Sequence, residues 1–147
     1  MKDKKIKSLN NEVSTSKIVD HLKRAGLRAT RQRLELGRLL FSGEDRHMTA
    51  ETLYVEAKSV GMSISLATIY NTLHQFTQAG MLRQVVVDPS RSYFDTNITD
   101  HHHFFFADEG ELIDIPQDKI ELSKLPRLPK GTELEGVDVV VRVTRGK

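Results

Sequence analysis

The segment from Ser65 to Gly80 constrains the fold of this chain more than any other. Its apolar side chains recur with helical spacing, which predicts a helix over about Leu66–Ala79 with Ser65 as its N-cap and Gly80 after its end. The inward face is apolar, with Leu66, Ile69, Leu73 and Phe76. The outward face carries small and amide side chains, Ala67, Thr68, Asn71, Gln75 and Gln78. Such a face suits the major groove of DNA, because Thr and Ala contact thymine methyl groups and amides hydrogen-bond adenine or phosphate.

Three shorter helices are expected before this one. They cover about Lys17–Ala25, the residues from the cap Thr30 to Phe41, and the residues from the cap Thr49 to Ser59. A turn at Gly61 joins the third helix to the fourth, which is the helix-turn-helix pattern. Strands over 82–87 and 92–95 around the turn 88–91 then predict a hairpin, the wing. The expected fold class is therefore α+β, with an N-terminal winged helix-turn-helix.

Duplex DNA is the partner that this arrangement predicts. The recognition helix is expected to lie in the groove, with basic residues of the preceding helix on the phosphates. Tyr70 lies at the margin of the two helix faces, so it fits either the edge of the core or a base or phosphate contact. The expected contact residues are Arg31, Arg33, Ser65, Ala67, Thr68, Tyr70, Asn71 and Gln75.

The charge changes sign along the chain. Residues 1–98 carry 15 Lys and Arg against 10 Asp and Glu, a net charge of +5, whereas residues 99–147 carry 7 against 10, a net charge of −3. A basic half joined to an acidic half fits a DNA-binding part followed by a part that attracts cations. We expect a DNA-binding domain over 1–98, with a basic N-terminal segment, and a metal- or haem-sensing dimerisation domain over 99–147.

The chain has no cysteine, which excludes disulfides, thiolate catalysis and cysteine-based zinc sites. No apolar run approaches the ~20 residues that a bilayer crossing requires, so we expect no membrane span. The Lys-rich opening is not followed by the apolar stretch of a secretory signal, and we therefore expect a cytoplasmic protein.

Three consecutive histidines mark the second half of the chain. On an extended strand alternate side chains share a face, so His101 and His103 point one way while Asp100 and His102 point the other. Asp95 at the end of the wing and Asp114 at the end of a strand over 112–115 could bind the same ion after folding. Mixed nitrogen and oxygen ligands suit zinc, manganese or ferrous iron, and the spacing does not choose among them.

The remainder of the chain is expected to build a small α/β domain. Pro116 can open a helix through about Lys124, which Pro126–Pro129 would end, and 137–143 is a strongly apolar strand. With only about fifty residues available, we expect a mixed sheet that is completed by a second subunit.

Five segments together resemble the ferric-uptake-regulator superfamily in order and spacing. They are LRATRQRLELGRLL, RHMTAETLY, SLATIYNTLHQF, SYFDTNITDHHHFFF and GELIDI, and the resemblance covers about Leu27–Glu121. Within that superfamily, HHHFFF and the absence of cysteine resemble the iron response regulator branch, which responds to haem. The resemblance implies a homodimeric, iron-responsive transcription regulator that binds an AT-rich inverted repeat.

The resemblance also implies metal ligands. The sensing site would fall on His47, Asp95, His101, His103 and Asp114. A second set would fall on Asp100, His102 and Glu121, with Val137 where relatives carry a histidine. The sequence departs from the family because it lacks both the paired CxxC motifs and the Cys-Pro haem motif. Haem binding would then fall to His101, His102 and His103, beside three phenylalanines that can contact a porphyrin or form strand and dimer core.

Three other functions compete with this one. A zinc, manganese or peroxide sensor of the same superfamily differs only in the ion that it binds. A small non-haem iron oxygenase could use two histidines and a carboxylate, but it leaves the outward face of the recognition helix unexplained, so we expect no enzyme. A metal-storage or haem-carrier protein leaves the basic excess before residue 99 unexplained.

Overall fold

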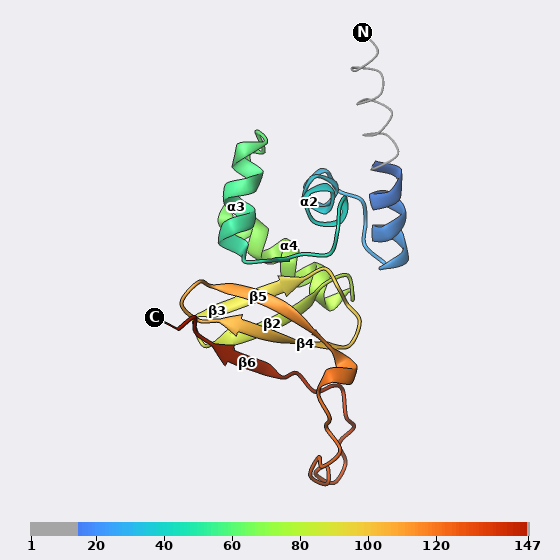
Figure 1. The fold of residues 1–147 in the computed structure, drawn as a ribbon. Coiled ribbons are helices and arrows are strands. Elements are labelled where there is room, and N and C mark those ends of the chain that lie inside the picture. Colours follow the sequence, from blue (N-terminus) through green and yellow to red (C-terminus); the bar gives the residue numbers. More distant parts are fainter. Residues whose placement is uncertain (1–14, 147) are drawn as a thin grey trace. The chain divides into compact units, whose positions relative to one another are not determined.

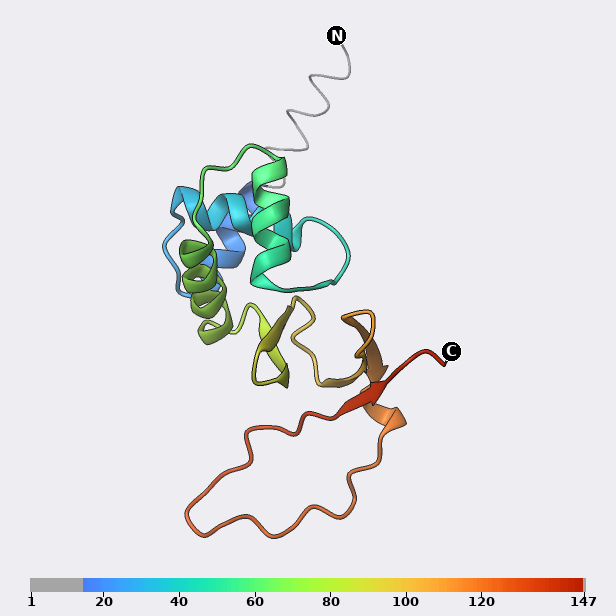
Figure 2. The ribbon, with the colours of Figure 1, turned by 90° about the vertical axis from the view of Figure 1, so that its left-hand side faces the viewer.

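The computed structural model describes residues 15–146, and these form two compact units that meet between Ile98 and Thr99. Figures 1 and 2 show helices followed by a small sheet in the first unit, and a second sheet with a long loop in the other.

The first unit is built from four helical segments and three short strands. In chain order they are the helical residues 15–24, α2 (Arg31–Phe41), β1 (His47–Met48), α3 (Ala50–Ser59), α4 (Leu66–Gln78), β2 (Arg83–Asp88) and β3 (Arg91–Asp95). The three caps expected from the sequence are confirmed: Thr30 and Ser65 accept hydrogen bonds from the backbone of their helices, and Thr49 forms a capping box with Thr52. Gly80, which follows α4, has a φ of 78°, a left-handed conformation that glycine adopts without strain.

The core of this unit lies between the helices and the wing. Ile69, Leu73 and Phe76 of α4 are fully buried, so the inward face expected for this helix is confirmed at these positions, while Leu66 is only half-buried. Leu22, Leu36 and the other core residues close around them. This packing leaves the opposite face of α4 in solvent.

The sheet of the first unit has the order β1–β3–β2, and all pairs are antiparallel. The two wing strands were expected from the sequence, with bounds one residue different at some ends. Strand β1 was not expected, because two residues are too few to show an alternating pattern. Its pairing places His47 opposite Asp95 and Met48 opposite Phe94.

A close approach between helices predicts the effect of one substitution. A Cβ at Gly37 in α2 would lie 2.7 Å from Cγ2 of Ile18. Gly37→Ala should therefore destabilise the fold by about 1–2 kcal/mol, because overpacking outweighs the gain in helix propensity. Urea denaturation measures this, with Gly43→Ala as the control, since a Cβ there meets nothing within 4 Å. Equal stability of the two variants would contradict the prediction.

The second unit is a mixed three-stranded sheet in the order β5–β4–β6. Strand β4 (His101–Phe106) pairs antiparallel with β5 (Glu111–Pro116) and parallel with β6 (Val140–Val143). The apolar strand expected over 137–143 is thus shorter than expected, and its neighbour is β4 of the same chain. The α+β fold class is confirmed.

The helix expected from Pro116 to Lys124 is wrong. Only a 3-10 turn, η1 (Gln117–Lys119), is present. Pro116 ends β5 instead of opening a helix. Residues 121–136 are all exposed, and Leu122 is 39% exposed. The segment therefore does not bury an apolar face, and it is such burial that stabilises most helices in proteins.

Candidate metal and nucleic-acid sites

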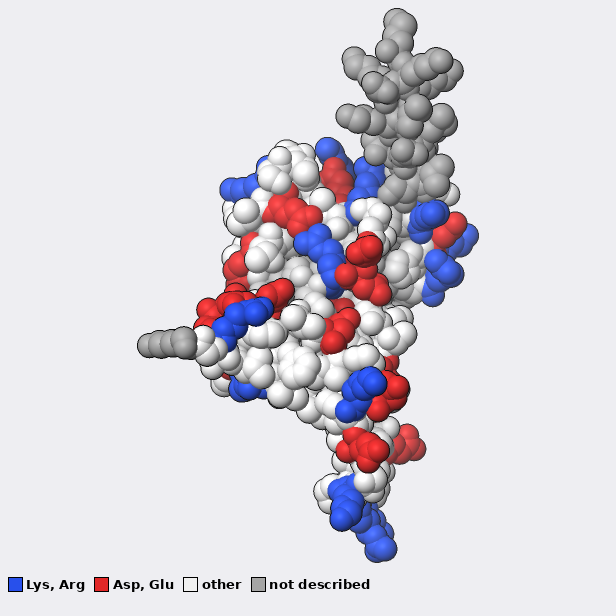
Figure 3. All heavy atoms as spheres, in the orientation of Figure 1, with Lys and Arg blue, Asp and Glu red and all other residues white. Residues whose placement is uncertain are grey.

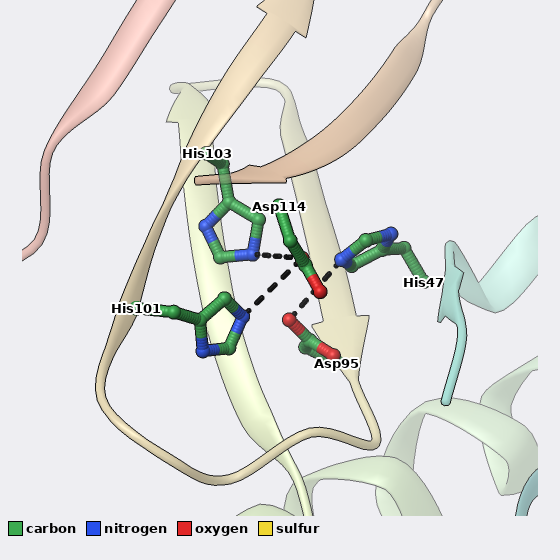
Figure 4. A group of neighbouring side chains, drawn as sticks. All are labelled: His47, Asp95, His101, His103 and Asp114. Carbon is green, nitrogen blue, oxygen red and sulfur yellow. Dashed lines mark ion pairs between the residues drawn. The ribbon is translucent and has the colours of Figure 1, made fainter. Parts of the chain in front are cut away.

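A histidine and a carboxylate face each other in the first unit. Nε2 of His47 lies 3.2 Å from Oδ2 of Asp95, and the Asp95 residue has no solvent exposure. The other Asp95 oxygen accepts a hydrogen bond from the backbone N–H of Asn97 at 2.9 Å. Figure 4 shows the two side chains pointing toward one another from β1 and β3. The β1–β3 register creates this pair, although 48 positions separate the residues in the chain.

The backbone beside His47 is held by Arg46. Its N–H donates to Oγ1 of Thr96 at 2.8 Å, and its carbonyl accepts from the N–H of Thr96 at 3.1 Å. Its guanidinium donates to both carboxylate oxygens of Glu56, at 2.9 and 2.7 Å, and this pairing lowers the pKa of Glu56. Arg46, Glu56 and Thr96 therefore fix the strand that carries His47. Sequence reasoning missed them, because nothing in their local pattern indicates the pairing.

Glu56→Gln should lower the free energy of unfolding by about 1 kcal/mol at neutral pH, since both side chains are about one-third exposed and the pair is partly screened. A depressed carboxylate pKa stabilises the fold at pH values above 4.5, the ordinary value. The advantage of the wild-type chain should disappear as the pH falls through the lowered pKa. Urea denaturation across this pH range measures the difference, and the exposed Glu44→Gln is the control. A difference that persists at low pH would contradict the assignment.

The second unit brings two imidazoles to one carboxylate. Nε2 of His101 and Nε2 of His103 each lie 3.4 Å from Oδ1 of Asp114, and the two rings have centroids 4.5 Å apart. Both histidines are buried, while Asp114 is exposed. Strand alternation and the β4–β5 register, which pairs His103 with Asp114, produce the arrangement (Figure 4). The shared face predicted for His101 and His103 is thereby confirmed.

The hydrogen bond of His101 suits a metal ligand. Its Nδ1 lies within hydrogen-bond distance of the carbonyl oxygen of Thr99, which can only accept, so the proton is on Nδ1. Nε2, the nitrogen toward Asp114, is then the one that can bind an ion. Metal-binding histidines commonly donate their second N–H to a carbonyl in this way. Two imidazoles and a carboxylate form a ligand set for a divalent ion.

His102 is bound differently. Its Nδ1 accepts a hydrogen bond from the backbone N–H of Val139 at 3.1 Å, so in the neutral ring the proton is on Nε2. Neither nitrogen then has a lone pair ready for a metal. Among residues 15–146, the ligand atoms of Asp100, His102 and Glu121 do not form a cluster, and both acidic residues are exposed. The structure does not bring the second predicted set together.

The outward face of α4 is accessible. Ala67, Asn71 and Gln75 are exposed, and Thr68 and Tyr70 are half-exposed. Ser65 is the exposed N-cap and accepts the backbone N–H of Thr68. These six residues, which the sequence predicted as contact residues, therefore lie where a ligand can reach them.

Two side chains of this face are held by hydrogen bonds to neighbouring helices. The hydroxyl of Tyr70 donates to Oε1 of Glu51, and this bond raises the pKa of Tyr70. The guanidinium of Arg33 donates to Oε1 of Gln75, at 3.1 and 3.4 Å, and to the carbonyl oxygen of Arg28 at 2.9 Å. Tyr70 and Gln75 are thus oriented by α3 and α2, respectively.

Arg31, the remaining predicted contact residue, has a side chain that is 90% exposed. It pairs with Glu35 one turn along α2, at 3.2 Å. Its position gives a basic group at the start of that helix. Glu51 is a further residue that sequence reasoning missed, and its place two residues after the Thr49 cap gave no sign of a contact with α4.

Comparisons with known proteins agree on one family. Residues 24–142 match the sequence profile described as "Ferric uptake regulator family". A ferric uptake regulation protein of Pseudomonas aeruginosa is 33% identical over 128 residues, which cover 86% of this chain and 96% of that protein.

Solved structures agree with the sequence comparison. The ferric uptake regulator from Pseudomonas aeruginosa, solved with manganese, has a TM-score of 0.68 and 30% identity, covering 88% of this chain and 98% of that one. The Vibrio cholerae regulator has a TM-score of 0.68 and 27% identity, covering 86% and 98%. No helix within residues 15–146 is long and apolar enough to cross a membrane.

Proposed function

This chain belongs to the ferric uptake regulator family, and on that premise we propose that it reports iron status by binding operator DNA as a homodimer. Members of the family are metal-responsive transcription regulators and not enzymes.

We propose one sensing ion that takes ligands from both units. His47 and Asp95 alone supply two ligand side chains, and His101, His103 and Asp114 supply three. Six peptide links join Asp95 to His101 and can span at most about 20 Å between the two Cα atoms, which limits how far the two groups of ligands can separate. An ion that binds one arrangement of the units better than others would favour that arrangement. This is how metal binding would control DNA affinity.

We propose that the recognition helix α4 enters the major groove of an AT-rich inverted repeat. Its accessible Ala67, Asn71 and Gln75 support this, because small and amide side chains are the ones that read A·T pairs. The phosphate contacts would come from Arg31 and from Arg33, whose guanidinium already lies against α4. A dimer would present two such helices to the two half-sites.

The experiment that tests the function is a titration of operator affinity. The metal-free protein is mixed with a duplex selected from a random library, and affinity is measured by fluorescence anisotropy with added Fe²⁺ (without oxygen), Mn²⁺ or Zn²⁺. We expect a divalent ion to change affinity at least about tenfold, the range of ordinary allosteric coupling. A response to Fe²⁺ supports iron sensing, and a response only to Zn²⁺ or Mn²⁺ assigns the alternative sensor. No response to any ion would overturn the proposal.

Haem is the second signal to be tested, as the likeness of HHHFFF to the iron response regulator branch implies. His101, His102 and His103 are only 5%, 3% and 3% exposed, and a porphyrin would have to displace the residues that cover them. This burial favours an ion over haem in the described arrangement. Replacing all three histidines with alanine should abolish any haem-dependent loss of DNA binding and leave metal-free DNA binding mostly intact. A triple variant that still responds to haem would exclude these ligands.

A further inference from the structure

A long loop in the second unit carries apolar side chains that remain partly exposed to solvent. It joins η1 to β6 and has no helix or strand over residues 120–139. Figure 2 shows it running away from the strands of its own unit. Its four leucines are 39–55% exposed: Leu122, Leu125, Leu128 and Leu134. Structureless loops of this length are uncommon in compact domains unless they have a function.

The central part of the loop repeats a triplet. Residues 122–130 read Leu-Ser-Lys, Leu-Pro-Arg, Leu-Pro-Lys, and we call this segment the Leu-Pro arm. Pro126 and Pro129 fix their own φ angles and restrict Leu125 and Leu128 to extended conformations. Residues 125–129 carry neither helix, strand nor turn, as expected for a polyproline II segment.

Three residues per turn give the arm two distinct edges. Leu125 and Leu128 then share one edge, and Arg127, flanked by Lys124 and Lys130, lies on another. Figure 3 shows Lys and Arg gathered at the far end of this loop. A partner must therefore offer an apolar strip together with negative charge.

The sheet of the second unit offers both. Phe104 pairs with Ile113 on one side and with Val141 on the other, which gives an apolar row across all three strands. Phe104 is 38% exposed, Ile113 is 41% exposed and Val141 is half-buried. Without the three cations of the arm, residues 99–147 carry four basic against ten acidic residues, a net charge of −6. Strand alternation places Glu111 on the same face as Phe104 and Arg142 on the other face, so the apolar row has a carboxylate beside it and no strand cation.

We propose that the Leu-Pro arm of one protomer docks on the apolar row of the β5–β4–β6 sheet of a second copy of this chain. The proposal rests on the homodimer of the proposed function and deepens it. DNA explains the cationic edge but not the leucines, whereas the sheet explains both. In the described structure the three leucines of the arm are 39–46% exposed, so their own chain does not cover them fully.

The first test measures the dimer dissociation constant by analytical ultracentrifugation, without DNA or metal. Leu128→Asp should raise this dissociation constant by about tenfold or more, because burying one leucine side chain changes an association constant by roughly tenfold to a hundredfold. Leu134→Asp, in the same loop but outside the triplets, should leave it near the wild-type value. Both leucines are exposed, so neither change should unfold the chain. A wild-type protein that stays monomeric at all concentrations would remove the premise, and unchanged dimerisation in Leu128→Asp would overturn only the arm.

The second test identifies the surface that the arm meets. The chain has no cysteine, so two introduced cysteines give an unambiguous disulfide. Mixing Leu128→Cys protein with Phe104→Cys protein under mild oxidation should yield a disulfide-linked heterodimer, and Val55→Cys in place of Phe104→Cys should not. A third protein carries both Leu128→Cys and Phe104→Cys in one chain. If its disulfide forms only within a chain, and the mixed single variants form none, the proposal is overturned. A Leu128→Asp variant that loses DNA affinity while its dimerisation is unchanged would also overturn it.

Discussion

Replacing Asn71 with glutamate is expected to weaken binding to operator DNA by about a hundredfold or more. Asn71 is exposed in the middle of α4, the position from which an amide can pair with adenine. A lost bidentate contact costs roughly 1–3 kcal/mol, and the new carboxylate adds repulsion from the phosphates. Fluorescence anisotropy with the metal-loaded protein measures the loss.

Val55→Glu is the matched control for this change. Val55 is 67% exposed on α3, and the substitution alters the net charge by the same amount. If the two variants bind DNA equally well, α4 does not lie in the groove and the effect is only one of net charge. Because Asn71 has no place in the core, the Asn71→Glu variant should unfold at the same urea concentration as the wild type.

Replacing His103 with alanine is expected to weaken binding of the sensing ion by at least about a hundredfold. Removing groups that only support a ligand costs 10–100-fold, and His103 would be a ligand itself. The operator response to the ion should be lost at ion concentrations that saturate the wild type. Isothermal titration calorimetry with Mn²⁺ measures the affinity directly, without DNA.

His74→Ala serves as the control for ion binding. His74 is exposed on α4, and its ring contacts Tyr70 and Phe94. The substitution removes a histidine that does not belong to the proposed ligand set. The calorimetric affinity for Mn²⁺ should therefore stay within a factor of about two of the wild type, which is the scatter expected for independent sites. An ion affinity that falls equally in both variants, or in neither, would place the ion elsewhere.

Helix α4 illustrates what local pattern can predict. Ile69, Leu73 and Phe76 recur at the helical period, and burial of one face follows from that period alone. The caps Thr30, Thr49 and Ser65 were predictable because an N-cap acts on backbone groups two or three residues away. The shared face of His101 and His103 was predictable for the same reason, since strand alternation is local.

The predicted helix after Pro116 failed because its stability depends on a surface to pack against, and the sequence does not show that none exists. The different bonding of His102 also escaped prediction. It depends on β6, which lies beside β4 although 37 positions separate His102 from Val139.

Sequence by itself determined the winged-helix pattern, the exposed amide face of α4 and the histidines that alternate along β4. Only the tertiary structure decided that a two-residue strand places His47 against Asp95, that Arg46 and Glu56 hold that strand, and that His101 and His103 meet Asp114. The physical reason is range. Helix periods, caps and strand alternation act within a few residues, whereas these pairs form by strand register between segments that the sequence keeps apart.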